Sequence, residues 1–116
     1  NASISLELAQ QTLKDILIVE PPVITVESIQ KVVADHHRLK VNELKSKNKA
    51  KQIAFPRQIA MYLCKTLTNK SLPEIGRQFG GKHHSTVIHA IKKIEDKRSN
   101  EQDFDRLIHR FIEMLQ

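Results

Sequence analysis

The sequence predicts an all-α protein: a helical bundle that contains a helix-turn-helix and is preceded by a short separate helix. Three observations support this class. Apolar residues recur at spacings of three and four along most of the chain, as they do on the inward faces of helices. Residues that cap helices stand where these repeats begin. The only run that resembles a strand, residues 23–26, is too short and too close to Pro21 and Pro22.

The composition points to a single basic domain. The chain has 116 residues, which is enough to bury a core without disulfides or metal. Its 19 lysines and arginines exceed its 13 acidic residues, so the formal net charge is +6. This excess favours a polyanionic partner, either nucleic acid or an anionic membrane surface. The alternative is a basic protein that uses its charge for no such partner.

Cysteine usage and hydropathy indicate the compartment. Cys64 is the only cysteine, so it has no partner for an internal disulfide and fits a reducing environment. No stretch approaches the roughly 20 apolar residues of a membrane span, and the first residues do not follow the secretory signal pattern. We therefore expect a cytoplasmic protein. The chain begins without methionine, and we expect it to be part of a larger protein.

Two helices are predicted before residue 40. The first covers residues 5–17 and ends before a linker at Glu20-Pro21-Pro22, where the prolines forbid helix. Thr25 is the expected N-cap of the second, which should run to about Leu39. The apolar face of the first comprises Leu6, Ala9, Leu13, Ile16 and Leu17, and one face of the second comprises Ile29, Val32, Val33 and His36, the last expected to be partly buried.

A lysine-rich segment separates these helices from the rest. Val41 and Leu44 predict one brief helical turn. We call residues 45–51 the basic loop, because four of its seven residues are lysines and none is acidic. Pro56 is expected in the first turn of a long helix that ends near residues 68–69 and buries Ile59, Ala60, Leu63, Cys64 and Leu67. Ser99 and Gln102 have capping-box spacing and predict a terminal helix with a stripe of Phe104, Leu107, Ile108, Phe111, Ile112 and Leu115.

Residues 71–93 predict the helix-turn-helix. Ser71 and Glu74 form a capping box, so a helix should start just after Ser71 and stop near Phe79. Gly80 and Gly81 then supply the positive φ of a tight turn. A second helix should run from about His84 to Lys97, with an inward stripe of Val87, Ala90, Ile91 and Ile94.

The outward face of that second helix could read bases. It carries His84, Ser85, Ile88, His89 and Lys92. Short polar groups and cations can bond base edges in the major groove, and an isoleucine among them can meet a thymine methyl. The alternative is a hydrated helix surface with no ligand, which the same spacing allows.

The basic loop suits phosphate contact or entry into the minor groove, since Lys47, Lys49 and Lys51 precede Arg57 closely in sequence. The alternative is a solvated loop. Gln58 and Lys65 lie further along the same helix and could touch the DNA backbone or be ordinary surface residues. Membrane binding is the rival use of the charge, and the helix of residues 25–39 is its best candidate.

The sequence gives little support to an enzyme. His83, His84 and His89 lack the spacing and the accompanying cysteines or carboxylates of a metal site. No phosphate-binding GxxxxGK[ST] motif occurs, so no nucleotide site is expected. We therefore expect neither catalytic residues nor metal ligands.

Residues 56–94 read PRQIAMYLCKTLTNKSLPEIGRQFGGKHHSTVIHAIKKI. This run resembles the C-terminal DNA-binding domain of the bacterial replication initiator DnaA, whose turn signature is similar to GG[RK]DH[ST]TV. The resemblance extends from about Ile24 to Ile94, and more loosely to the end. It implies a Trp-repressor-like helix-turn-helix over residues 41–116, a connecting helix over 23–40, and the last helix of an AAA+ lid with a linker over 1–22.

The resemblance also implies a function, the binding of nine-base-pair boxes in double-stranded DNA at the replication origin. His84, Ser85 and Thr86 match the family positions that enter the major groove, with Ile88 near a thymine methyl. A basic-loop arginine of the family enters the minor groove, where this chain offers Lys49 or Lys51. The implied DNA-binding set is Lys47, Lys49, Lys51, Arg57, Gln58, Lys65, His83, His84, Ser85, Thr86, Ile88 and His89, of which Arg57, Gln58 and Lys65 match backbone-holding positions.

Properties of the full-length family members are implied only for a longer protein. These are binding of ATP or ADP with Mg, response to acidic phospholipids, and self-oligomerisation through the AAA+ module. The chain itself is expected to hold no cofactor and to be monomeric. One position departs from the family: His83 stands where an aspartate is usual, so the preference at one base, or its pH dependence, is expected to differ. A helix-turn-helix transcription regulator and a membrane-surface or protein-interaction module are the alternative functions.

Overall fold

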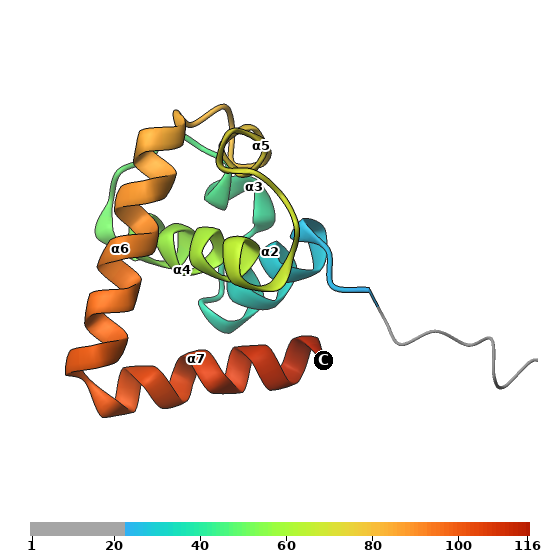
Figure 1. The fold of residues 1–116 in the computed structure, drawn as a ribbon. Coiled ribbons are helices and arrows are strands. Elements are labelled where there is room, and N and C mark those ends of the chain that lie inside the picture. Colours follow the sequence, from blue (N-terminus) through green and yellow to red (C-terminus); the bar gives the residue numbers. More distant parts are fainter. Residues whose placement is uncertain (1–22) are drawn as a thin grey trace, which may run out of the picture.

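The computed structural model describes residues 23–116, and within them the secondary structure is helical without strands (Figure 1). The all-α prediction is therefore confirmed for this part of the chain. The predicted helix of residues 5–17 and the linker that follows it lie outside the described residues. The helices are α2 (Val26–His36), α3 (Val41–Leu44), α4 (Lys51–Leu67), α5 (Leu72–Gln78), α6 (His84–Asn100) and α7 (Gln102–Leu115).

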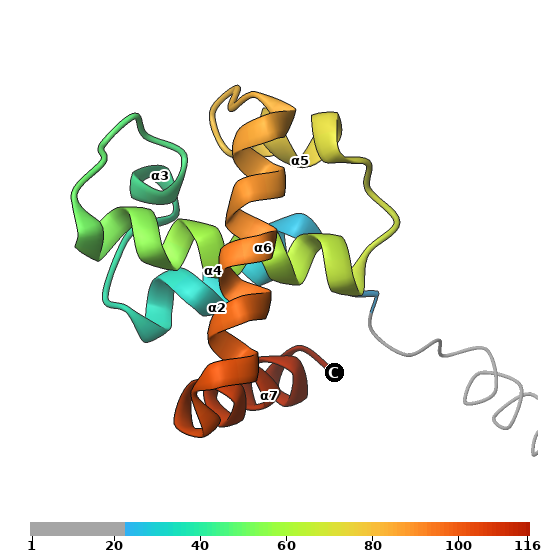
Figure 2. The same ribbon diagram turned by 60° about the vertical axis from the view of Figure 1, so that its left-hand side comes forward.

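The core forms around α4, which α2, α5 and α6 contact from different sides (Figures 1 and 2). α7 closes the end of the bundle opposite the turn between α5 and α6. Because α2 buries Val26, Ile29 and Val33 in this same core, the connecting helix packs as part of the bundle. The other fully buried large side chains include Leu44, Ile59, Met61, Leu63, Ile75, Phe79, Ile94, Ile108 and Phe111.

Helix α2 starts as predicted and ends earlier. The Thr25 hydroxyl accepts a hydrogen bond from the Ser28 amide at 3.0 Å, and the Ser28 hydroxyl accepts from the Thr25 amide at 3.0 Å. The helix stops at His36, short of the predicted Leu39, because Arg38 adopts a positive φ of 59°. The prediction that His36 is partly buried is wrong, since the residue is exposed, although its ring packs edge-on against Phe111.

Helix α4 begins at Lys51, so Pro56 lies inside the helix and the prediction that it marks the first turn is wrong. Polar contacts from the preceding loop favour this earlier start. The Ala50 amide, just before the helix, donates to the Asn48 side chain at 2.8 Å. The Ala50 carbonyl already accepts the helical hydrogen bond from Ala54 at 2.8 Å.

The boundary between α6 and α7 also differs from the prediction. α6 continues to Asn100, so Ser99 lies within it and does not cap the terminal helix. Side chains hold the corner instead. Arg98 donates to the Asp105 carboxylate at 2.6 Å and to the Tyr62 hydroxyl at 2.8 Å, which joins α6, α7 and α4. The predicted apolar stripe of α7 is confirmed, with Phe104, Ile108, Phe111 and Leu115 buried.

Candidate nucleic-acid interface

The first helix of the predicted helix-turn-helix is α5, and its start is confirmed. The Ser71 hydroxyl accepts from the Glu74 amide at 3.3 Å, while the Glu74 carboxylate accepts from the Ser71 amide at 3.1 Å. Hydrogen bonds from the Ser71 backbone and hydroxyl lower the pKa of the Glu74 carboxyl. Ile75 and Phe79 bury the inner side of this unit against Val87 and the rest of the core.

The turn between α5 and α6 has the backbone that its two glycines predict. Gly80 has φ of 83° and Gly81 has φ of 78°. The chain then folds back, and the Lys82 amide donates to the Gly76 carbonyl at 2.8 Å. This bond fixes the direction in which the chain enters α6.

His83 is the N-cap of α6, a role that the sequence did not indicate. Its Nδ1 accepts from the Ser85 amide at 3.2 Å and lies 2.9 Å from the Ser85 hydroxyl. A ring nitrogen that accepts a hydrogen bond from a backbone amide carries no proton. The neutral tautomer in this cap therefore has its hydrogen on Nε2. The free nitrogen of His83 is therefore a donor in this arrangement, whereas an aspartate at the same position would present an acceptor.

The face of α6 that the sequence assigned to base reading is open to solvent. The predicted inward residues Val87, Ala90 and Ile94 are buried, and Ile91 is half-buried. Ile88 is 42% exposed, which makes it one of three large apolar side chains at the surface of the described residues. His83, His84, Ser85, Thr86, His89 and Lys92 are exposed as well.

The basic loop is held by its own polar side chains. The Ser46 hydroxyl donates to the Glu43 carbonyl at 2.7 Å and accepts from the Asn48 amide at 3.2 Å. Asn48 in turn accepts from the Ala50 amide. Side chains that bond the local backbone in this way define turns. Lys45, Lys47, Lys49 and Lys51 are all exposed.

Arg57 is only 6% exposed, and its guanidinium is directed at the protein's own backbone. Nε donates to the Leu44 carbonyl at 2.8 Å, and Nη2 donates to the Ser46 and Asn48 carbonyls at 2.9 Å each. Burial lowers the pKa of this guanidinium. Arg57 therefore ties α4 to the basic loop, a role that only the three-dimensional structure reveals, and its contact with DNA stays a prediction.

The basic loop also meets the turn between α5 and α6. Lys82 Nζ donates to the Ser46 carbonyl at 2.8 Å, so this one oxygen accepts from both Lys82 and Arg57. Gly80 lies so close to the Lys45 carbonyl oxygen that a Cβ at Gly80 would overlap it. The loop and the turn lie at the same end of the molecule, away from α7 (Figure 2). Local sequence patterns carry no signal of this contact, which joins residues 36 positions apart.

Two other predicted residues lie on α4. Lys65 is exposed. Gln58 is half-buried, and its Oε1 is buried without a hydrogen-bond partner. Since phosphate oxygens only accept hydrogen bonds, the amide nitrogen is the end of Gln58 that can bond a DNA phosphate.

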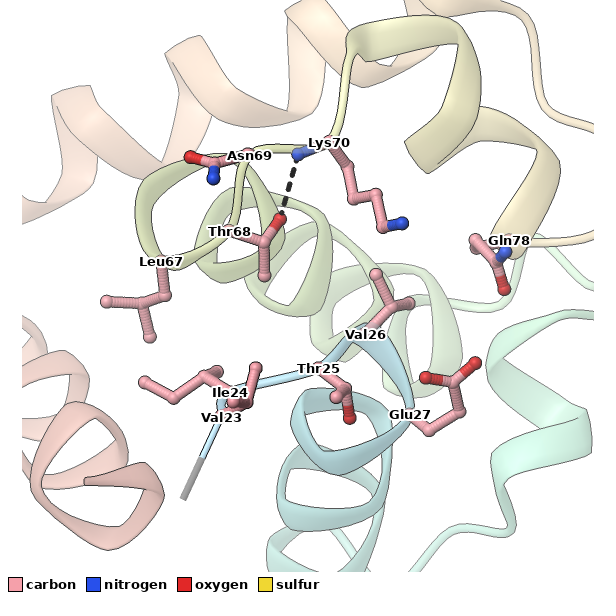
Figure 3. Close-up of a pocket in the computed structure, with 10 residues that line it drawn as sticks. All are labelled: Val23, Ile24, Thr25, Val26, Glu27, Leu67, Thr68, Asn69, Lys70 and Gln78. Carbon is pink, nitrogen blue, oxygen red and sulfur yellow. Dashed lines mark hydrogen bonds between the residues drawn. The ribbon is translucent and has the colours of Figure 1, made fainter. Parts of the chain in front are cut away.

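A pocket of about 560 Å³ lies away from the basic loop, between the start of α2, the end of α4 and the end of α5 (Figure 3). Ile24, Val26 and Leu67 provide apolar lining, and Glu27 and Lys70 are its charged residues. The lining contains no histidine or cysteine, so it offers no Ser–His or Cys–His pair.

Within residues 23–116, the structure contains neither a metal-binding group of side chains nor a membrane-spanning helix. In this part of the chain, no three His, Cys, Asp or Glu side chains are grouped to hold a metal ion. Over the same residues, none of the helices combines the length and the apolar character needed to cross a membrane.

Comparisons with known proteins agree on one family. The family model described as "Bacterial dnaA protein helix-turn-helix" matches residues 26–94. The chromosomal replication initiator protein DnaA of Geobacter sp. (strain M21) is 52% identical over 101 residues, which cover 87% of this chain and 22% of that protein. The protein of the same name from Burkholderia multivorans is 53% identical over 106 residues, which cover 91% of this chain and 20% of that protein.

A solved structure described as a DNA replication initiation factor has a similar fold. It aligns with a TM-score of 0.70 at 34% identity, covering 78% of this chain and 27% of its own. The chain thus spans about a fifth of the length of the curated relatives that it matches.

Proposed function

Because this chain belongs to the family of bacterial DnaA helix-turn-helix domains, we propose that it binds double-stranded DNA sequence-specifically at initiator boxes of the replication origin. In this role it is a non-catalytic part of a protein that starts and regulates chromosomal replication. The observation that carries the proposal is the contact between the basic loop and the turn before α6. It brings two surfaces suited to two different DNA grooves to one end of a small domain.

The proposed major-groove reader is the first half of α6. A helix fits this groove, where each base pair presents a distinct pattern of donors and acceptors. His84, Ser85 and Thr86 are exposed in the first turn, and Ile88 adds an apolar surface that a thymine methyl can cover. His83 and His89 extend the contact at its two ends. Bonds to base edges from these side chains supply the sequence preference.

The proposed minor-groove and phosphate contacts come from the basic loop and α4. Lys47, Lys49 and Lys51 are exposed cations on a backbone held by Arg57. Lysine carries the charge that a narrow minor groove attracts but lacks the planar fork of arginine, so this contact contributes attraction more than geometric selectivity. Gln58 and Lys65 are proposed to touch the DNA backbone from α4.

Other properties are proposed for the longer protein from the likeness to the family. They are cytoplasmic location, ATP or ADP binding with Mg, response to acidic phospholipids and self-oligomerisation. Nucleotide binding, the response to phospholipids and self-oligomerisation are assigned to parts of that protein outside this chain. The domain itself is proposed to bind DNA as a monomer.

Binding of a labelled duplex that carries an initiator box, compared with a scrambled duplex across a salt series, tests the proposal. We expect the box to bind more tightly at every salt concentration, by a ratio on the order of 10³ as for other sequence-specific proteins. Equal affinity for the two duplexes would contradict it, because charge alone gives salt-sensitive binding without base preference. Selectivity for an unrelated operator would favour a transcription regulator, and binding to anionic vesicles with no duplex preference would favour a membrane-surface module.

A further inference from the structure

Lys82 stands at the junction of the two proposed DNA-binding surfaces. It is the last residue of the turn before His83 caps α6, and its backbone amide is fixed to the Gly76 carbonyl at 2.8 Å. Its side chain leaves this turn and donates to the Ser46 carbonyl of the basic loop at 2.8 Å. Lys82 therefore bonds the helix-turn-helix with its backbone and the loop with its ammonium group.

We infer that Lys82 is a positioning residue, which holds the basic loop at a fixed distance from α6 so that the two surfaces meet one DNA segment together. The inference rests on the proposed function and assigns this residue a role that neither the family signature nor the outward face of α6 indicates. A shift between the two surfaces would misplace one of them whenever the other is correctly seated in its groove.

A second observation supports the same arrangement independently. Gly80, in the same turn, lies against the Lys45 carbonyl so closely that no side chain fits there. The turn thus touches the loop at two consecutive carbonyls, once by packing at Lys45 and once by a hydrogen bond at Ser46. Two contacts fix an orientation that one contact leaves free to swing.

The bond from Lys82 to the Ser46 carbonyl lies among other cations. The half-buried ammonium of Lys82 lies close to Arg57 and Lys47, and burial, followed by these two cations, lowers the pKa of Lys82. A phosphate nearby would relieve the repulsion among them. The ammonium of Lys82 bonds the Ser46 carbonyl and not a loop side chain, so this bond can persist while a phosphate binds the exposed lysines of the loop.

Arg57 is a poor subject for the test, because its buried guanidinium holds several carbonyls and its removal would disturb the fold. Lys82→Met keeps the length of the stem and removes the donor, and Lys82→Arg restores a donor. Lys70→Met is the matched control: it removes an exposed lysine that precedes α5, whose side chain makes no hydrogen bond to the loop. Thermal unfolding shows first that each variant is folded.

The first measurement uses the free protein, so its outcome does not depend on whether the chain recognises initiator boxes. The heteronuclear NOE of the Ser46, Lys47 and Lys49 amides reports how firmly the loop is held. We expect these NOE values to fall in Lys82→Met and to recover in Lys82→Arg, with wild-type values in Lys70→Met. Unchanged values in Lys82→Met would overturn the inference even if box binding is intact.

The second measurement is affinity for the box duplex in two backgrounds. Lys82→Met removes a hydrogen bond from a charged group that holds the loop in place. We therefore expect it to weaken box binding roughly tenfold. In the background K47A/K49A/K51A the same change should have almost no further effect, because the loop no longer carries the charges that Lys82 positions. An equal loss in both backgrounds would mean that Lys82 contacts phosphate directly and would overturn its positioning role.

Discussion

His83 caps α6 through one ring nitrogen and leaves the other available at the start of the helix. Since Nδ1 accepts from the Ser85 amide at 3.2 Å, the Nε2–H remains as a donor. A donor suits guanine O6 or N7, thymine O4 or a phosphate, while the cytosine amino group needs an acceptor.

The first prediction concerns this residue. His83→Asp should keep the cap, since aspartate is a strongly preferred N-cap, and should present a carboxylate oxygen to the DNA. We expect the preference at one base pair to move toward an exposed cytosine amino group, by roughly 1 to 3 kcal/mol. Affinities for the four variants of that base pair measure the shift. His83→Asn, which also caps but can offer either end of its amide, is the control; identical profiles for wild type and His83→Asp would contradict the assignment.

Cys64 gives a pH-dependent contribution to stability. Its side chain is fully buried, and burial raises the pKa of the thiol to about 12 from its ordinary value of 9.0, with a smaller effect of Glu27. The unfolded thiol releases its proton above pH 9.0 while the folded thiol keeps it. The stabilisation is therefore complete below the ordinary pKa and declines as the pH rises from there toward the folded value, by up to about 1.4 kcal/mol per pH unit.

The second prediction follows from this loss of stability at high pH. Cys64→Ala removes the titrating group, so the free energy of unfolding of wild type should fall relative to that of the variant only above about pH 9. Urea unfolding of both proteins from pH 7 to 10.5 measures the difference, and all other titrating groups cancel. If the two stabilities changed in parallel across this range, the thiol would not be buried as described.

At the scale of elements, the turn before α6 shows two separate reasons for glycine, a positive φ and a close approach to another chain segment. Gly80 and Gly81 both have positive φ, but a Cβ at Gly80 would overlap the Lys45 carbonyl whereas a Cβ at Gly81 would meet nothing. The two residues therefore share the conformational strain of substitution and differ in the contact with the basic loop.

The third prediction uses this matched pair. Gly81→Ala should lower the free energy of unfolding by about 1 to 2 kcal/mol, the usual cost of a left-handed conformation for a residue with a Cβ. Gly80→Ala should cost more than this and also weaken DNA binding, since the loop must move away from the turn. Chemical denaturation and duplex affinity of both variants check it. Equal effects of the two changes would show that the turn and the loop are not in close contact.

Sequence patterns predicted the elements that short-range chemistry determines. The Ser71 capping box, the glycine turn and the inward stripe of α6 involve residues within a few positions of one another, so their spacing is visible in the sequence. The prediction from Pro56 was wrong because polar contacts in the preceding loop favour a start of α4 before it, and the prediction from Ser99 was wrong because α6 continues past it to a corner that Arg98 holds. The internal role of Arg57 and the bond from Lys82 to Ser46 depend on chain segments far apart in sequence, and no spacing encodes them.

At the scale of the whole molecule, the end that carries the basic loop and the turn before α6 lies opposite α7 (Figure 2). Lys47, Lys49 and Lys51 are exposed there beside Lys82. Arg106, on α7 at the opposite end, is exposed and pairs with Asp103 at 3.2 Å. The net charge of the whole chain is +6, but its effect on DNA affinity depends on which cations come close to phosphates.

The last prediction distinguishes the effect of net charge from the effect of cations that lie close to phosphates. Each phosphate that a protein neutralises on B-DNA contributes about −0.9 to the slope of log K against log salt concentration. Lys49→Ala and Arg106→Ala remove one positive charge each, yet only the first lies on the proposed interface. We expect Lys49→Ala to make the slope less steep by about 1 and Arg106→Ala to leave it unchanged. Box affinities at several salt concentrations measure both slopes; equal changes would mean that overall charge, and not the loop beside α6, governs the encounter with DNA.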